Sequence, residues 1–266
     1  LSGMVDGAWS LGAYVVNAGL SYTNSQSKDI NSLTSSQARS NWKYNPVGMH
    51  TNEPNLTSSN YEVPHRIVGS LGATFNFVEN SSTTFSFFYE GQSGRPFSYK
   101  GEEGDIDYNG DGDARNDLIF VFNDASKVNM VDSDGNNAWD AWTAFVDQDD
   151  ALKEYKGKII DRNAGRQPWK NRLDLRITQK VFGWVELTFD ILNFANLLSS
   201  DAGKQEYVRY GTVDLLEFTG FADENDVSSK PTFVFDKDKY TKTEDIYSVD
   251  DFGSRWQMLL GLRIDI

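Results

Sequence analysis

The chain has 266 residues and carries 25 Lys and Arg against 39 Asp and Glu, a formal net charge of −14 at pH 7. So acidic a chain lacks the basic surface that general nucleic-acid binding requires. It contains no cysteine, which excludes disulfides, a thiolate nucleophile and cysteine-bound zinc. No apolar run approaches the roughly 18 residues of a membrane-spanning helix, yet 14% of the residues are aromatic, a high share for so polar a chain.

Six segments alternate apolar and polar residues with a period of two, which predicts β-strands. They lie at about 9–23, 64–78, 83–99, 170–182, 184–197 and 254–266. In the last segment every second residue from Trp256 to Ile266 is apolar, while Arg263 and Asp265 fall on the other face. These runs exceed the five or six residues usual in soluble sheets, and their length suits a tilted strand that crosses a bilayer.

The connections between these strands alternate between short and long. Segments 79–82 and 182–184 are tight turns, whereas long loops extend over about 24–62, 100–168 and 198–253. This alternation is typical of outer-membrane barrels, which have short periplasmic turns and long extracellular loops. The loops are acidic and rich in Asn, Ser and Gly. We interpret their charge as solvation of the exterior; the alternative is attraction for cations or cationic ligands. The pattern predicts an all-β fold in which residues 1–266 form an antiparallel transmembrane β-barrel segment.

Aromatic residues that carry a polar group occur near the strand ends, as in the girdles at membrane interfaces. They are Tyr22, Tyr89, Trp169, Trp184 and Trp256. The polar faces of the later strands carry charges, which we expect to face the barrel lumen, to pair across adjacent strands and to contact a plug. They are Arg172, Asp174, Arg176, Glu186, Asp190 and Arg263. A soluble sandwich also explains the alternation, but it accounts poorly for these charges and for the long unpatterned loops.

Several strings then match a known family. In chain order they are 40–46 (SNWKYNP), 61–68 (YEVPHRIV), 91–99 (GQSGRPFSY), 105–120 (DIDYNGDGDARNDLIF) and 161–169 (DRNAGRQPW). Together they resemble the carboxy-terminal part of the barrel of Oar-like TonB-dependent outer-membrane receptors of the Bacteroidota type. The resemblance extends from about residue 20 to the end, apart from about 123–158 and 200–250. It implies that the chain supplies about six strands of a 22-stranded barrel.

The resemblance also implies a function. Extracellular loops would capture a ligand, and the plugged barrel would import it across the outer membrane of a Gram-negative cell, with no enzymatic step. Implied partners are the protein's own amino-terminal plug domain and remaining barrel strands, the TonB complex, the barrel-assembly machinery at the C-terminal strand, and lipopolysaccharide with other outer-membrane lipid. The alternatives are a passive porin or adhesion-type barrel, and a secreted soluble β-sandwich that binds or hydrolyses carbohydrate.

Segment 107–117 resembles the first half of a calcium loop. Oxygen-bearing side chains occupy positions one, three and five, and a glycine that permits the bend occupies position six. Leu118 stands at position twelve, where an EF-hand has glutamate. The expected ligands are Asp107, Asn109, Asp111, Asp113 and Asp117. We predict a structural calcium ion in the loop 105–117; the alternative is a turn rich in Asx and Gly that binds nothing. Segment 132–136 is a weaker candidate of the same kind.

Overall fold

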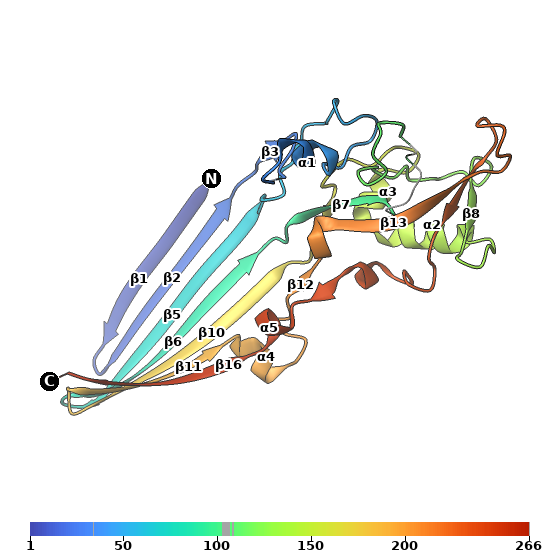
Figure 1. The fold of residues 1–266 in the computed structure, drawn as a ribbon. Coiled ribbons are helices and arrows are strands. Elements are labelled where there is room, and N and C mark those ends of the chain that lie inside the picture. The colour runs from blue at the N-terminus through green and yellow to red at the C-terminus, as the bar shows by residue number, and fades with distance from the viewer. Residues whose placement is uncertain (34, 103–106, 108, 266) are drawn as a thin grey trace.

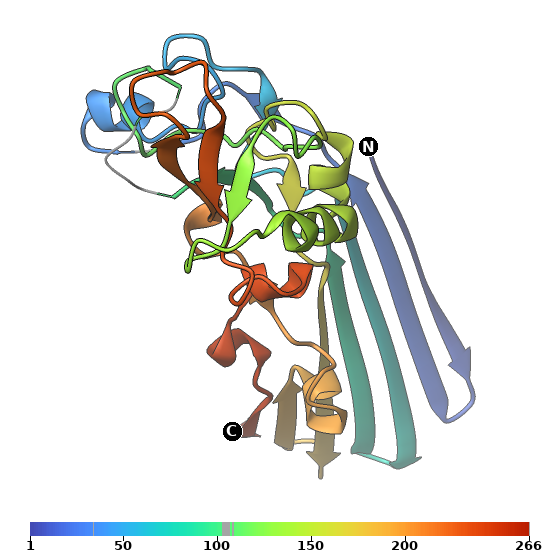
Figure 2. The ribbon, with the colours of Figure 1, turned by 90° about the vertical axis from the view of Figure 1, so that its right-hand side faces the viewer.

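The computed structural model describes residues 1–266 except 34, 103–106, 108 and 266. It has two parts, a long open sheet and a compact cap at one end of its strands (Figure 1). Figure 2 shows the same arrangement from the side, with the tight turns at the end of the strands away from the cap. Asp105 and Ile266, which belong to the expected calcium loop and last strand, lie outside the described residues.

Seven antiparallel strands form the long sheet, called here the main sheet. In sheet order they are β1 (Ser2–Leu11), β2 (Tyr14–Asn24), β5 (His65–Val78), β6 (Ser81–Gln92), β10 (Lys170–Val181), β11 (Val185–Leu192) and β16 (Gln257–Ile264). The prediction of a mostly β fold built on an antiparallel sheet is confirmed. The sheet is open, and among the described residues β1 and β16 are its two edges.

The register of the main sheet collects like side chains on each face. Leu175 lies level with Phe87 on β6 and with Ile191 on β11, whereas the neighbouring Arg176 lies level with Asp190. Because side chains alternate between the two faces of a strand, this alignment places apolar residues beside apolar residues, and polar beside polar, on every strand of the sheet. One face is therefore mostly apolar and the other mostly polar, and we call them the apolar face and the polar face.

Three predicted strands differ from those observed. Segment 9–23 is a hairpin, because the chain reverses at Gly12, which has a left-handed φ of 68°, so the sheet has one strand more than expected. Segment 83–99 divides into β6 and the cap strand β7 (Pro96–Gly101), with Gly94 packed directly against the backbone of Gln167 between them. Segment 184–197 ends as a strand at Leu192, since Asn193 is left-handed (φ 52°) and opens the short helix α4 (Phe194–Leu198).

The cap is built from the three long connections. Its five-stranded sheet has the order β8 (Asn129–Val131), β14 (Pro231–Val234), β13 (Thr212–Phe221), β7 and β9 (Gly165–Arg166). Smaller elements are β3 (Lys28–Asp29), α1 (Ala38–Lys43), β4 (Thr57–Ser58), α2 (Trp139–Gln148), α3 (Asp150–Glu154), β12 (Glu206–Tyr207), η1 (Arg209–Gly211), η2 (Thr243–Ile246), β15 (Ser248–Val249) and α5 (Asp251–Ser254). The sequence pattern did not predict these elements within the long connections. Their strands are short, and some pair in parallel with distant segments, so no alternation was visible.

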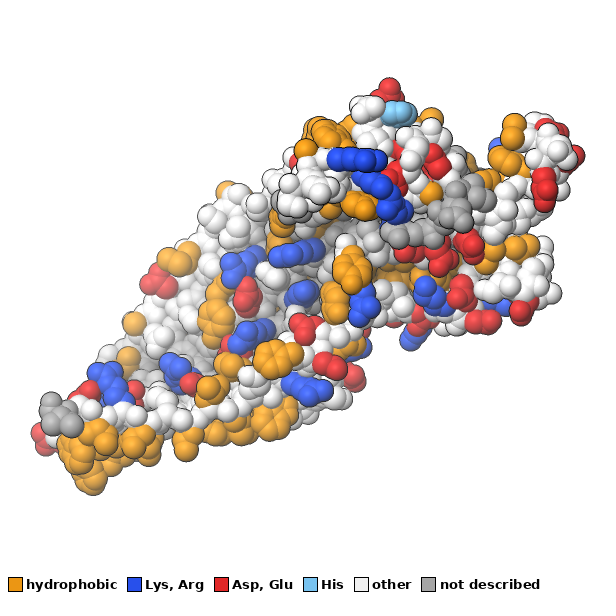
Figure 3. Space-filling view, in the orientation of Figure 1, with side chains coloured by type: hydrophobic (Ala, Val, Ile, Leu, Met, Phe, Trp, Pro, Cys, Tyr) orange, Lys and Arg blue, Asp and Glu red, His pale blue; other side chains and the backbone are white. Residues whose placement is uncertain are grey.

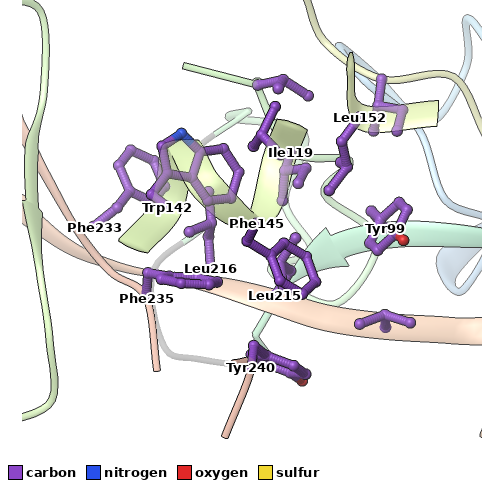
Figure 4. Close-up of a cluster of buried hydrophobic side chains, with 14 of the residues drawn as sticks. Tyr99, Ile119, Trp142, Phe145, Leu152, Leu215, Leu216, Phe233, Phe235 and Tyr240 are labelled. Carbon is purple, nitrogen blue, oxygen red and sulfur yellow. The ribbon is translucent and has the colours of Figure 1, made fainter. Parts of the chain in front are cut away.

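The cap encloses a hydrophobic core of its own (Figure 4). Helix α2 supplies the buried Trp142, whose ring packs edge-on against Phe235 at 5.6 Å between centroids. The indole N–H of Trp142 donates a hydrogen bond of 2.9 Å to the carbonyl of Phe122, so its one polar group is satisfied. Phe145, one helical turn further on, packs against Phe235 and Tyr240. Burial of such large aromatic side chains dominates the stability of a core of this size.

A buried arginine connects the first long connection to the second. The Arg162 side chain is 4% exposed and donates to Asp29 at both its carboxylate (2.6 Å) and its carbonyl (2.7 Å). Burial acts to raise the pKa of Asp29, but hydrogen bonds from Ser32 and Arg162 outweigh it and bring the pKa below its ordinary value. Because a buried guanidinium is costly without its partners, this pair fixes how the two segments meet.

A second ion pair in the cap gives a pH-dependent prediction. Lys237 donates to Asp132 at 2.5 Å, and this bond lowers the pKa of Asp132 to about 2. A depressed pKa stabilises the fold above the ordinary pKa of aspartate, and that contribution disappears as the pH falls through about 2. We therefore expect Asp132→Asn to lower the cap's melting temperature at pH 7, with the difference from wild type closing between about pH 4 and pH 2. Thermal unfolding of both proteins across this range measures it, and a difference that is constant with pH would contradict it.

Candidate functional site

The apolar face of the main sheet is largely exposed. Leu20 is 59% exposed and Leu260 is 81% exposed. Other exposed side chains on this face are Val5, Trp9, Leu71, Phe85, Leu187, Leu262 and Ile264. None of them belongs to the buried cluster of the cap. Figure 3 shows hydrophobic side chains in a continuous row along the lower edge of the sheet.

Helix α4 covers a small part of this face. It packs against β10, and its Phe194 ring lies 6.5 Å from that of Phe87. Beside it, Leu175 and Ile191 are the two apolar residues of the main sheet that are fully buried. Leu198, at the end of the same helix, is 72% exposed. The apolar surface therefore continues from the sheet onto this helix.

The predicted interfacial aromatics lie near the ends of the strands. Tyr22 shares a hydrogen bond of 2.7 Å with His65, and Tyr89 donates one of 2.7 Å to Asn171. Together with Trp169 and Trp256, these tyrosines lie toward the cap, whereas Trp184 begins the strand after the distant turn and is 52% exposed. Trp9 and Tyr14 flank the turn of the first hairpin. The sequence pattern does not predict them as interfacial aromatics, because it predicts a single strand in place of this hairpin.

The polar face carries the six predicted charges, but they pair only partly as expected. Arg176 binds Asp190 on the adjacent strand through two hydrogen bonds, Nε to Oδ1 at 2.5 Å and Nη2 to Oδ2 at 2.9 Å. Arg172 instead pairs along its own strand with Asp174 at 2.9 Å, and Arg263 does the same with Asp265 at 2.9 Å. Lys180 lies 3.9 Å from Glu186 on the neighbouring strand. Exposed pairs of this kind contribute about 0–1 kcal/mol each, so they neutralise the face more than they stabilise it.

The acidic loop brings three of the five predicted metal ligands together. Carboxylate oxygens of Asp107, Asp111 and Asp117 all lie within 4.8 Å of one another. Asp113 instead binds cations, with Arg115 at 2.8 Å and Lys43 at 3.5 Å. Burial raises the pKa of Asp113, and the charges of Asp111 and Asp107 raise it further.

The rest of the loop is held by its own hydrogen bonds. The backbone N–H groups of Gly110 and Gly112 donate to Asp107 at 2.7 and 2.6 Å, and the side-chain oxygen of Asn109 accepts from the N–H of Asp111 at 2.9 Å. Both glycines have left-handed φ angles, which explains why glycine stands there. Within the described part of the chain no second group of three or more carboxylates is this close, and the weaker candidate 132–136 forms no such group.

No protein-family model, curated protein or solved structure matches the chain. No helix in the described ranges is long and apolar enough to span a membrane. The features of the structure that bear on function are therefore the two-faced sheet, the cap and the acidic loop.

Proposed function

We propose that the chain is the carboxy-terminal part of the barrel of a TonB-dependent outer-membrane transporter. The exposed apolar face of the main sheet carries this proposal. Soluble monomers rarely expose a contiguous apolar patch larger than a few hundred Å², and lipid is the environment in which such a face needs no protein partner. A soluble sandwich would bury this face beneath a second sheet, whereas the cap's sheet surrounds a core of its own.

The strand lengths agree with this environment. The strands of the main sheet have from 8 to 14 residues. At about 3.3 Å per residue and a tilt of about 40°, ten residues rise roughly 25 Å, the height of the apolar band of outer-membrane barrels. Aromatic residues lie near both ends of the strands, where the apolar band of such a barrel would meet water and lipopolysaccharide.

The finer parts of the proposal rest on the five strings that resemble Oar-like receptors. The free edges of β1 and β16 would pair with the remaining strands of a 22-stranded barrel, and β16 would contact the barrel-assembly machinery. Arg172, Arg176 and the other charges of the polar face would line the lumen and meet the plug, which couples to the TonB complex. The cap would stand on the extracellular side and capture the ligand.

Fractionation of cells that express the native gene tests the proposal. We expect the protein in the outer membrane, extracted only by detergent, with the cap cleaved when protease is added to intact cells. A monodisperse protein that stays soluble without detergent would contradict the membrane assignment. If the protein is in the membrane but ligand uptake continues after the gene for TonB is deleted, a passive porin-like barrel replaces the transporter.

We also propose that Asp107, Asp111 and Asp117 bind a structural calcium ion in the cap. Hard cations prefer carboxylate oxygens, and removing one of three charges weakens Ca²⁺ binding by about tenfold or more. Asp111→Asn should show this loss in calorimetric titration, and calcium should protect the wild-type loop from protease. Asp113→Asn is the matched control, because Asp113 binds Arg115 and Lys43 instead. Equal effects of both substitutions, or unchanged proteolysis after a chelator is added, would refute the site.

A further inference from the structure

A cavity of about 470 Å³ lies where the polar face of the main sheet meets the cap. Its lining comes from four separate segments and includes Tyr61, Gln92, Arg95, Gln167, Lys170 and Tyr210. A smaller cavity of about 230 Å³ adjoins it and shares Gln92 and Lys170. Figure 3 shows Lys and Arg side chains on this hollowed side of the molecule. The volume lies within the range of natural ligand sites.

Two cations in the main cavity have no acidic partner. No described residue forms an ion pair or a side-chain hydrogen bond with Arg95 or Lys170, although the chain as a whole is strongly acidic. The described residues that line the main cavity include no carboxylate, and Glu90 in the adjoining cavity already pairs with Arg66 at 2.6 Å. The cavity is therefore locally positive and would attract a negatively charged ligand.

An amide without a hydrogen-bond partner points to hydroxyl recognition in the same cavity. Gln167 is only 8% exposed, and its side-chain amide forms no hydrogen bond with any residue in the described part of the chain. Its backbone is fixed, since its N–H donates to the carbonyl of Arg95 at 3.0 Å and Gly94 packs against it. The amide atoms are open to the cavity and not sealed from solvent, so a ligand hydroxyl can reach them and supply a partner.

Exposed tyrosine rings complete the lining. Tyr210 is 92% exposed and has a left-handed φ of 57°, unusual for a residue with a side chain. Such a conformation costs energy for a residue with a large side chain and is enriched at functional positions. Tyr61 is 61% exposed, and Tyr207 also lines the cavity. Flat rings with a polar tip, beside amides and cations, match a sugar ring that has apolar faces, hydroxyls at its edge and a carboxylate.

We propose that this cavity binds a short acidic oligosaccharide of uronic acid units. Arg95 and Lys170 bind the carboxylates, Gln167 and Gln92 bind hydroxyls, and the tyrosines stack on the sugar faces. The proposal deepens the transporter function and rests on it, because it names the ligand that the cap would deliver to the lumen.

Calorimetric titration of the full-length, detergent-purified protein with trigalacturonate tests the proposal. We expect binding that weakens as salt is added and falls at least tenfold in Lys170→Gln and in Tyr210→Ala. Lys180→Gln is the matched control, since Lys180 lies on the same face of β10 but outside the cavity, and it should bind as wild type does. Near-ultraviolet circular dichroism verifies that each variant is folded.

Three outcomes would overturn the proposal: no binding of trigalacturonate at millimolar concentration, equally tight binding of neutral maltotriose, or preferential binding of triglutamate. Fractionation separates these results from failure of the proposed function. An outer-membrane protein that ignores trigalacturonate refutes the ligand alone, whereas a soluble protein that binds it refutes the transporter alone.

Discussion

Replacing Leu71 with arginine is expected to stop the protein from assembling in the outer membrane. Leu71 lies midway along β5 on the apolar face, level with Ala18 and Phe87, and is 47% exposed. In a bilayer, an arginine at the midplane of a barrel strand costs about 2–4 kcal/mol. Cell fractionation and the heat-dependent migration of folded barrels in SDS gels would show the loss.

Two control variants separate lipid contact from core packing. Ser70→Arg puts the same charge on the preceding residue, which is exposed on the polar face, and this variant should assemble normally. Leu71→Trp should also assemble, because fluid lipid adapts to a larger side chain, whereas a close-packed core loses about 1–3 kcal/mol on overpacking. If Leu71→Trp fails as Leu71→Arg does, a protein surface and not lipid covers the apolar face.

The sequence pattern predicted the main sheet where its strands are long and regular. Segment 170–182 became β10 (Lys170–Val181), and 64–78 became β5 (His65–Val78). Both strands have ten or more residues with one apolar face, so alternation alone sets their limits and their register. The first hairpin was missed because Gly3 and Gly7 stand at apolar-face positions of β1, which weakens its pattern.

The cap and its cavity could not be predicted in this way. Strand β13 pairs in parallel with β7, about 110 residues earlier in the chain, and no local pattern encodes such a partner. The cavity likewise combines Tyr61, Arg95, Gln167 and Tyr210 from distant segments. By contrast, the acidic cluster could be predicted from sequence because its carboxylates are close in the chain. Only their pairing, such as Asp113 with Arg115, required the structure.

Trp142→Ala is expected to destabilise the cap while the main sheet still assembles. The Trp142 side chain is fully buried, and removing a buried tryptophan costs about 3–5 kcal/mol. The substitution also removes the hydrogen bond from the indole N–H to the carbonyl of Phe122, which adds the cost of a lost hydrogen bond. Protease added to intact cells should cleave the cap of the variant faster than that of wild type.

Separate measurements on the same cells decide whether the two parts fold independently. No residue of the main sheet belongs to the buried cluster around Trp142, so the heat-dependent gel shift of the barrel should survive in Trp142→Ala. Trp142→Phe keeps most of the volume and should give an intermediate cleavage rate, and Phe252→Ala, at a site 77% exposed, should leave it unchanged. If the gel shift is lost together with the cap, the sheet depends on the cap for assembly. The main sheet would then not be an independent scaffold for the cap.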